Sequence, residues 1–466
     1  LTLRQKLQKL RPRLLLSKHL EFTFDPYESR RKSLWRLSLN IYSVILSTWR
    51  SYMGAVLLSP LYILLNLYLI SRMLLWFSTL HSFLGTPWFI APFLFCYVLI
   101  ALSPLMAAFS HGKWKQVSRI ISNYWLGTLM YMLIFLLLFD LGRILLRLSR
   151  KRSLFDPIDV DSYRISGGII FFGVILLSVY GIVHAGKIRK KHYDVNICKR
   201  LSASFTHTPD CRTKCPPESS APVLRIALIA DLHLGGSVGL PHARKMKKII
   251  DKMQPDLIIY AGDIFDNDFD AIDKPGEIAA VFRSLSSTYG SYACWGNHDI
   301  DEVILAGFTF NSGSAATTSD PRMDQFLVDA NIRLLKDETL LINDSFYLIG
   351  RLDASCRQKS GIIRKTAAEL IRPLDASRPV IVIDHQPSEL SELAAADADL
   401  VLSGHTHDGQ LFPGNITTRI GWKNSCGKLV LGNMTSIVTS GVGVWGPAMR
   451  IGTDSEVAEV DVTFLS

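Results

Sequence analysis

The sequence of 466 residues contains little charge and few cysteines. Charged residues make up 20% of it and hydrophobic residues 48%, a balance that excludes an intrinsically disordered or collagen-like chain. Its seven cysteines are an odd number without a repeated spacing, which excludes the disulfide framework of a small secreted protein. Internal repeats are absent as well. The mean hydropathy of +0.22 points instead to membrane segments.

The net charge of +10 hides two halves of opposite sign. Residues 1–220 contain 29 Lys and Arg against 10 Asp and Glu, a balance of +19. The remaining residues contain 22 Lys and Arg against 31 Asp and Glu, a balance of −9. We therefore expect two chemically different domains, and the basic overall composition does not predict nucleic-acid binding.

Four long hydrophobic runs in the N-terminal half contain no Asp, Glu, Lys or Arg. They are residues 53–71, 83–109, 120–139 and 165–186. A helix needs about 20 apolar residues to cross a bilayer, and these runs are apolar all round, unlike the amphipathic helices of soluble proteins. The sequence thus predicts a transmembrane domain of four helices over residues 53–186, with the lipid bilayer as its partner.

A basic arm, residues 1–52, precedes the first predicted span. Within it, residues 37–49 are short for a span and fit an amphipathic helix lying in the membrane interface. The eleven Lys and Arg of the arm and the even number of spans predict a multi-pass protein of the inner or plasma membrane with its C-terminal half in the cytoplasm. The basic loop before the fourth span opposes this orientation, and a crossing by residues 37–49 would reverse it.

Beyond residue 187 the pattern changes to short β-branched runs that alternate with amphipathic helical segments. Residues 187–221 are predicted to form a linker with a loop that contains Cys211 and Cys215. These two cysteines favour a surface loop, with or without a local disulfide, over a zinc clip, because no second pair accompanies them. Residues 222–466 are predicted to form an α/β domain in which helices cover largely buried strands.

Polar clusters follow five of the predicted strands, at the point where each strand ends. They are Asp231-Leu232-His233, Gly262-Asp263, Gly296-Asn297-His298-Asp299, Asp384-His385-Gln386-Pro387 and Gly404-His405-Thr406-His407. Ligand sites in α/β sheets lie at the carboxyl ends of the strands, so we expect the clusters to converge. Aspartate, asparagine and histidine together suit Mn, Fe, Zn or Co, and their number suits two divalent ions better than one.

The order of these clusters resembles that of the calcineurin-like metallophosphoesterase superfamily. Four segments also resemble its membrane-associated branch, known as transmembrane protein with metallophosphoesterase domain: residues 230–235, 385–387, 403–410 and 440–447. Asp408 departs from that branch, where Gly is common, and adds a charge beside a predicted ligand. The resemblance implies a β-sandwich flanked by helices, two divalent metal ions and a hydrolase acting on phosphoric ester or anhydride bonds.

The resemblance also implies a role for each polar residue. It assigns three side chains to the first metal: Asp231, His233 and His407. It assigns three to the second metal: Asn297, His385 and His405. Asp263 bridges the two ions. His298 faces the substrate, where it stabilises phosphoryl oxygens or protonates the leaving group, and Asp299 orients it.

The substrate class stays open among phosphate monoesters, phosphodiesters and pyrophosphates, because all three use the same ligand set. The membrane domain suggests a lipid-linked phosphate, and similar enzymes include some that cleave UDP-2,3-diacylglucosamine in lipid A synthesis. A non-catalytic membrane receptor or scaffold is an alternative from another class, which the complete ligand set opposes. A transporter is a further alternative, which the lack of charged residues in the predicted spans opposes.

Overall fold

A computed structural model of the chain describes residues 58–110, 112–149, 160–199, 201, 222–300, 304–305, 308–309, 319–356 and 362–465. All of them belong to one unit, Ser51–Ser466. The predicted interfacial helix over residues 37–49 lies outside the described residues, as do Cys211 and Cys215.

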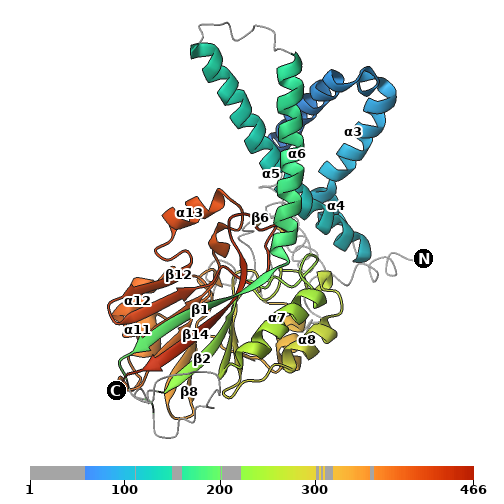
Figure 1. Cartoon of the computed structure of the whole chain (residues 1–466). Helices are drawn as coiled ribbons and strands as arrows, with labels where there is room; N and C mark the ends of the chain where they lie inside the picture. Colours follow the sequence, from blue (N-terminus) through green and yellow to red (C-terminus); the bar gives the residue numbers. More distant parts are fainter. Residues whose placement is uncertain are drawn as a thin grey trace, which may run out of the picture. The chain divides into compact units, whose positions relative to one another are not determined.

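Among the described residues, three helices are long and apolar enough to cross a membrane (Figure 1). They are Leu58–Leu80, α5 (Gly112–Ser149) and α6 (Val160–Ala185). Predicted spans one, three and four fall on these helices. The structure therefore agrees with an N-terminal membrane domain of apolar helices.

The segment predicted as the second span, residues 83–109, differs from the expectation of one long helix. It is divided into η2 (Ser82–Gly85), α3 (Pro87–Ala101) and α4 (Ser103–Phe109). Pro104 has no backbone N–H to donate to the carbonyl of Ile100, so the helix breaks between α3 and α4. The 15 residues of α3 are fewer than the roughly 20 that a span needs, so the number of crossings stays a prediction.

The long helices also extend past the uncharged runs and pair charged residues with one another. Arg72 of the helix Leu58–Leu80 lies 2.7 Å from the Asp140 carboxylate of α5, which also accepts a hydrogen bond of 2.7 Å from the Tyr68 hydroxyl. The pairing neutralises Asp140 and so lowers the cost of placing charge beside apolar helices. This pairing joins the helix Leu58–Leu80 to α5.

The described part of the C-terminal domain contains two six-stranded sheets and a small two-stranded one, β5 (Ile304–Leu305) with β6 (Phe308–Thr309). The first large sheet has the order β1 (Ile188–Ile197), β14 (Ser455–Phe464), β2 (Val223–Ile229), β3 (Leu257–Ala261), β4 (Ser291–Cys294), β7 (Arg333–Leu334). The second has the order β12 (Gly427–Leu431), β13 (Met434–Val438), β11 (Leu400–Ser403), β10 (Val380–Ile383), β9 (Phe346–Gly350), β8 (Glu338–Ile342).

The two large sheets pack face to face around one apolar core. Leu224, Ile226 and Leu228 of β2 meet Ile381 of β10 and Leu402 of β11 there. The other face of the first sheet packs on α7 (Leu240–Met253), α8 (Pro275–Arg283) and α9 (Pro321–Asp329). The other face of the second packs on α11 (Ala367–Ile371) and α12 (Leu390–Ala395) (Figure 1). Burial on both faces explains the unbroken apolar runs and confirms the predicted sandwich flanked by helices.

The predicted linker over residues 187–221 is wrong for its first third, because that segment forms β1 (Ile188–Ile197). β1 pairs in parallel with β14 at the edge of the first sheet. Tyr193, Val195 and Ile197 alternate with exposed polar residues, which is the pattern of a half-buried strand. The C-terminal domain thus begins directly after α6.

The directions of the strands determine where the polar clusters lie. β2, β3 and β4 run parallel to one another in the first sheet. β10 and β11 run parallel in the second. The carboxyl ends of parallel strands meet at one edge of a sheet, so the residues that follow these strands gather at one end of the sandwich.

Loops at this end contact the membrane helices. The backbone N–H of Arg450 donates to the carbonyl of Gly181 in α6 over 3.0 Å, and the Tyr131 hydroxyl of α5 donates to the carbonyl of Phe412 over 2.8 Å. Met449 and Ile451 pack in the same apolar cluster as residues of α5 and α6. The membrane helices therefore support the loops that surround the polar clusters.

We predict that Gly181→Ala destabilises the protein because a methyl group at residue 181 would lie 2.9 Å from Cγ1 of Ile451 and 3.2 Å from Cβ of Met449. Overpacking of this kind costs about 1–3 kcal/mol. Gly173→Ala is the matched control in the same helix, since its methyl group meets no heavy atom of the described residues within 4 Å. Thermal unfolding in detergent should show a lower Tm for Gly181→Ala alone, and equal Tm values for the two variants would contradict this packing.

Candidate metal centre

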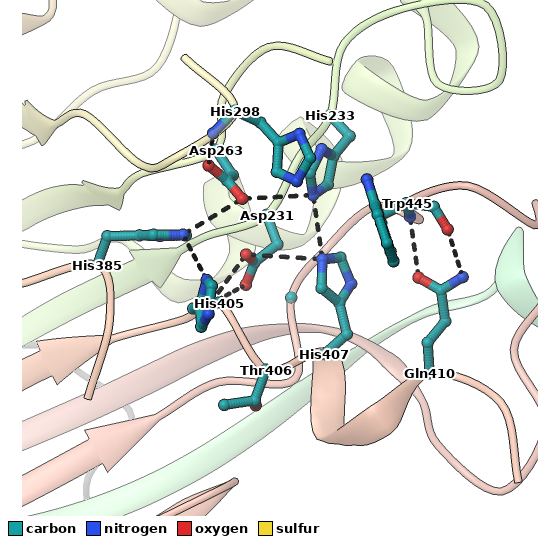
Figure 2. A network of polar contacts seen from close by, with 12 residues as sticks. Asp231, His233, Asp263, His298, His385, His405, Thr406, His407, Gln410 and Trp445 are labelled. Carbon is teal, nitrogen blue, oxygen red and sulfur yellow. Dashed lines mark hydrogen bonds and ion pairs between the residues drawn. The ribbon is translucent and has the colours of Figure 1, made fainter. Parts of the chain in front are cut away.

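All five polar clusters converge at the carboxyl ends of five strands, where the sequence predicted one site (Figure 2). Asp231 and His233 follow β2, Asp263 follows β3, and His385 follows β10. Residues 297–299 follow β4, and His405 and His407 follow β11. Every one of these residues except Asn297 and His405 is buried. The site therefore combines strands of both sheets.

One group of potential metal ligands consists of Asp231, His233 and His407. Their ligand atoms lie within 4.8 Å of one another. Nε2 of His407 is 3.0 Å from Nε2 of His233 and 3.7 Å from a carboxylate oxygen of Asp231. These are the three residues that the family resemblance assigned to the first ion.

A second group consists of Asp263, His385 and His405, again with ligand atoms within 4.8 Å of one another. The amide oxygen of Asn297 joins them, 3.1 Å from Nε2 of His385 and 2.8 Å from Nδ1 of His405. The structure thus gathers the residues assigned to the second ion. Ligation itself stays a prediction for both groups.

Asp263 lies between the two groups. Its Oδ2 atom is 3.2 Å from Nε2 of His385 in the second group and 3.7 Å from Nε2 of His233 in the first. Its Oδ1 atom accepts a hydrogen bond of 2.7 Å from the backbone N–H of His298. One carboxylate therefore reaches both groups, as a bridging ligand must.

The donor chemistry of this site fits divalent cations. Nδ1 of His385 lies 2.8 Å from the carbonyl oxygen of Ala261, so Nδ1 carries the proton. In the neutral ring, Nε2 then directs a lone pair at the oxygens of Asp263 and Asn297. Three acceptors facing one another repel unless a positive charge lies among them, and either a proton on Nε2 of His385 or a metal ion supplies that charge.

The histidines of the site differ in their protonation states. Burial lowers the pKa of His233 to about 3 and holds the pKa of His407 well below its usual value, so both rings are neutral and offer lone pairs. Burial raises the pKa of Asp263, but His385 and His298 outweigh it and bring that pKa well below its ordinary value. Burial lowers the pKa of His385, whereas Asp263 raises it to well above the usual value. The site therefore attracts positive charge.

Several residues of the site have a strained backbone conformation. The φ angles of five potential ligands are positive: Asp231, His233, Asp263, His405 and His407. A non-glycine residue in this region costs about 1–3 kcal/mol and persists where the surrounding structure enforces it, often at functional sites. Gly404 permits the close approach of these loops, since a methyl group there would lie 2.4 Å from Oδ2 of Asp231.

His298 lies beside the first group. Its ring centroid is 5.0 Å from the ring of His233 and 5.6 Å from the ring of Trp445. Its Nδ1 atom contacts the amide oxygen of Asn267. The ring is thus held by the amide of Asn267 and the indole of Trp445. Figure 2 shows it beside His233, with which it forms a third group of potential ligands that includes Asp266.

The predicted orienting role of Asp299 is corrected by the structure. Its carboxylate accepts hydrogen bonds from the backbone N–H of Phe265, over 2.9 Å, and from that of Gly296, over 2.8 Å. Burial raises the pKa of Asp299 well above its usual value. Asp299 therefore fixes the loops after β3 and β4, and Asn267 makes the contact with His298 that we had expected of Asp299.

Two supporting residues had no role assigned to them from the sequence. Asn267 follows Asp263 in a loop without a recognisable motif. Arg450 is fully buried and donates to the carbonyls of His407, Gly441 and Gly443 over 3.1, 3.2 and 2.7 Å. Burial lowers its pKa to about 10. An arginine within a Gly- and Pro-rich segment near the chain's end was the available signal for this role.

Comparison with known proteins agrees with the site. Residues 224–409 match the calcineurin-like phosphoesterase family. The chain is 26% identical over 381 residues to the transmembrane protein with metallophosphoesterase domain of Danio rerio, which covers 78% of this chain and 80% of the relative. It is 29% identical over 245 residues to an uncharacterized metallophosphoesterase of Campylobacter jejuni, which covers 50% of this chain and 58% of the relative.

A more distant relative is the UDP-2,3-diacylglucosamine pyrophosphatase LpxG of Chlamydia trachomatis. The chain is 22% identical to it over 220 residues, which cover 40% of this chain and 64% of the relative. The chain thus spans less than two thirds of the Campylobacter and Chlamydia proteins. The matches to all these relatives agree with the predicted phosphoesterase domain, and the Danio match agrees with its combination with membrane helices.

Proposed function

Because residues 224–409 match the calcineurin-like phosphoesterase family and the chain carries apolar helices of membrane-spanning length, we propose that it is a membrane-anchored enzyme that uses two divalent metal ions to hydrolyse phosphate ester or pyrophosphate bonds. The observation that supports this most is the sharing of Asp263 between two groups of potential ligands. A site for a single structural ion needs no such bridge.

Each part of the site has a proposed role. Asp231, His233 and His407 would hold one ion, and Asn297, His385 and His405 would hold the other, with Asp263 as a ligand of both. Two divalent ions held by these residues would supply an activated water and positive charge beside the phosphoryl oxygens. Imidazole and carboxylate ligands suit Mn, Fe, Zn or Co.

We assign to His298 the donation of a hydrogen bond or a proton to the substrate. Its Nδ1 atom is engaged by Asn267, which leaves Nε2 to act on the substrate. When the ring is protonated, Nε2–H donates to a phosphoryl oxygen or to the leaving group. Packing against Trp445 limits rotation of the ring, so the donor is already oriented when the substrate binds.

A lipid-linked phosphate is the substrate class that the fold favours, because the loops around the site rest on α5 and α6. The similarity to LpxG supports a nucleotide-linked lipid pyrophosphate as the second candidate. The eleven Lys and Arg of the N-terminal arm support a cytoplasmic position for the catalytic domain.

The proposed function predicts hydrolysis that depends on metal. The full chain, purified in detergent, should hydrolyse an aryl phosphate, an aryl phosphodiester or a nucleotide-linked lipid when supplied with Mn²⁺. A strong chelator should abolish the activity, and added Mn²⁺ should restore it. His192→Ala is the control variant, since this half-exposed histidine lies on β1, away from the site, and should keep full activity.

Two results would contradict the proposal. Hydrolysis that persists in the chelator would exclude a metal-dependent mechanism. Failure to hydrolyse all three substrate types with Mn, Fe, Zn and Co in turn would favour the receptor or scaffold alternative.

A further inference from the structure

One short helix beside the metal centre exposes an apolar face. In α13 (Gly414–Gly421), each of the eight described residues is partly or fully exposed. Ile416 and Ile420 are 49% and 82% exposed and lie one turn apart, so they share one face of the helix. Phe412, just before the helix, is 50% exposed. Among described residues, α7, α8 and α9 of the same domain bury their apolar faces instead.

The segment that leads into α13 rests on a membrane helix. The Tyr131 hydroxyl donates to the carbonyl of Phe412 over 2.8 Å. Leu411 packs in one apolar cluster with Leu129 and Met132 of α5 and with Val174 of α6. On one side of Tyr131, Arg119 and Asn123 of α5 contact the C-terminal domain, and on the other side Leu137 is exposed. Phe412 is therefore attached to α5 near the point where this helix leaves the C-terminal domain.

The helices to which this segment is attached also expose apolar residues. Leu137 of α5 and Leu176 of α6 are exposed apolar residues on helices long enough to span a bilayer. An exposed apolar face on a helix attached to such a surface gains free energy by burial among acyl chains, at about 25 cal/mol per Å². Arg419 on α13 and Lys423 just after it suit the phosphates at the bilayer surface.

The same helix borders the metal centre. Nε of Arg419 lies 3.8 Å from a carboxylate oxygen of Asp408, the neighbour of His407. A methyl group at Gly409 would lie 2.3 Å from the backbone nitrogen of Asn415, so α13 is packed tightly on the loop that carries His407. Trp422, which follows α13, has its ring centroid 5.1 Å from the ring of His405. A lipid held on α13 is thus adjacent to two potential metal ligands.

A polar cavity adjoins this helix on the side of Trp422. Its volume is about 590 Å³, and its walls include Arg419, Trp422, Lys423 and Asp408. The mixture of basic, acidic and aromatic side chains suits a polar headgroup rather than an acyl chain. The apolar face of α13, the polar cavity and the metal centre therefore match the three parts of an amphiphilic phosphate, which are its acyl chains, its headgroup and its phosphate group.

We propose that α13 lies in the membrane interface, with Phe412, Ile416 and Ile420 among phospholipid acyl chains, and that it presents the phosphate of a bilayer lipid to the metal centre. The first part concerns lipid contact alone. The second part rests on the proposed function and names its substrate as a lipid that stays in the bilayer during hydrolysis.

Photo-crosslinking tests the lipid contact. The full chain, with benzoylphenylalanine in place of Ile420, is reconstituted in phosphatidylcholine–phosphatidylglycerol nanodiscs and irradiated. The matched control carries the same group in place of Val328, which is 70% exposed on α9. Mass spectrometry should detect phospholipid adducts at residue 420 and background levels at residue 328. Equal adduct levels at the two positions, or adducts of residue 420 with protein alone, would overturn the proposal.

Activity tests the presentation of substrate. In the double variant Ile416→Ser with Ile420→Ser, hydrolysis of phosphatidic acid in vesicles should fall about 10-fold or more, since two apolar side chains no longer favour the bilayer. Hydrolysis of a soluble aryl phosphate should stay unchanged. Undiminished hydrolysis of vesicle phosphatidic acid by the variant would overturn the second part. An enzyme inactive on every phosphate would refute the proposed function, while crosslinking would still test the lipid contact.

Discussion

Asp263→Asn should lower kcat/KM by about 10³-fold or more, because one electrostatic stabilising group alone is worth about 10²–10³ and Asp263 is placed to serve both ions. Its Oδ2 atom lies 3.2 Å from Nε2 of His385 and 3.7 Å from Nε2 of His233, so the amide weakens both ligand groups at once. Steady-state kinetics with a saturating divalent ion on the full chain measures this loss.

Asp399→Asn is the matched control for Asp263→Asn. Asp399 is also a buried aspartate, but it precedes β11, at the end of the strand opposite the metal centre, where it accepts a hydrogen bond from the backbone of Val380. Its replacement should affect stability and leave kcat nearly unchanged. Equal losses in kcat/KM for the two variants would trace the effect to burial of an aspartate and contradict the bridging role.

His298→Ala should lower kcat by about 10²–10⁴-fold, the usual contribution of a positioned acid–base group. It should also keep the metal content of the unmodified chain, because the proposed ligand groups do not include this side chain. Asn267→Ala is expected to lower kcat as well, by a smaller factor, since it releases Nδ1 of His298 without removing the ring.

Elemental analysis distinguishes this role of His298 from ligation. His385→Ala provides the contrast, since it removes a proposed ligand and should lose metal. Loss of one metal equivalent in His298→Ala would show that His298 is a ligand and would contradict our assignment.

Much of the site could be predicted from local sequence because parallel strands impose a simple geometry. Runs such as β3 (Leu257–Ala261) are recognisable as buried strands, and the polar residues that follow such strands must meet at one edge. The five clusters therefore converge even though Asp231 and His407 are 176 positions apart in the sequence.

What the sequence could not predict depends on tertiary packing. The carboxylate of Asp299 bonds to two backbone N–H groups of neighbouring loops, and no spacing rule distinguishes this from a bond to the adjacent His298. The break between α3 and α4 follows from Pro104, whose effect is hidden within an otherwise continuous apolar run. The exposed side of β1 is charged, so the sequence of the predicted linker did not indicate a strand there.

The number of divalent ions bound per chain tests the central claim most directly. After dialysis against metal-free buffer and loading with Mn²⁺, elemental analysis of the purified full chain should find about two equivalents, as a bridged pair of ions requires. The Asp263→Asn variant should retain at most one. A fully active chain that binds one equivalent, or a variant that keeps both ions, would contradict a two-metal phosphoesterase bridged by Asp263.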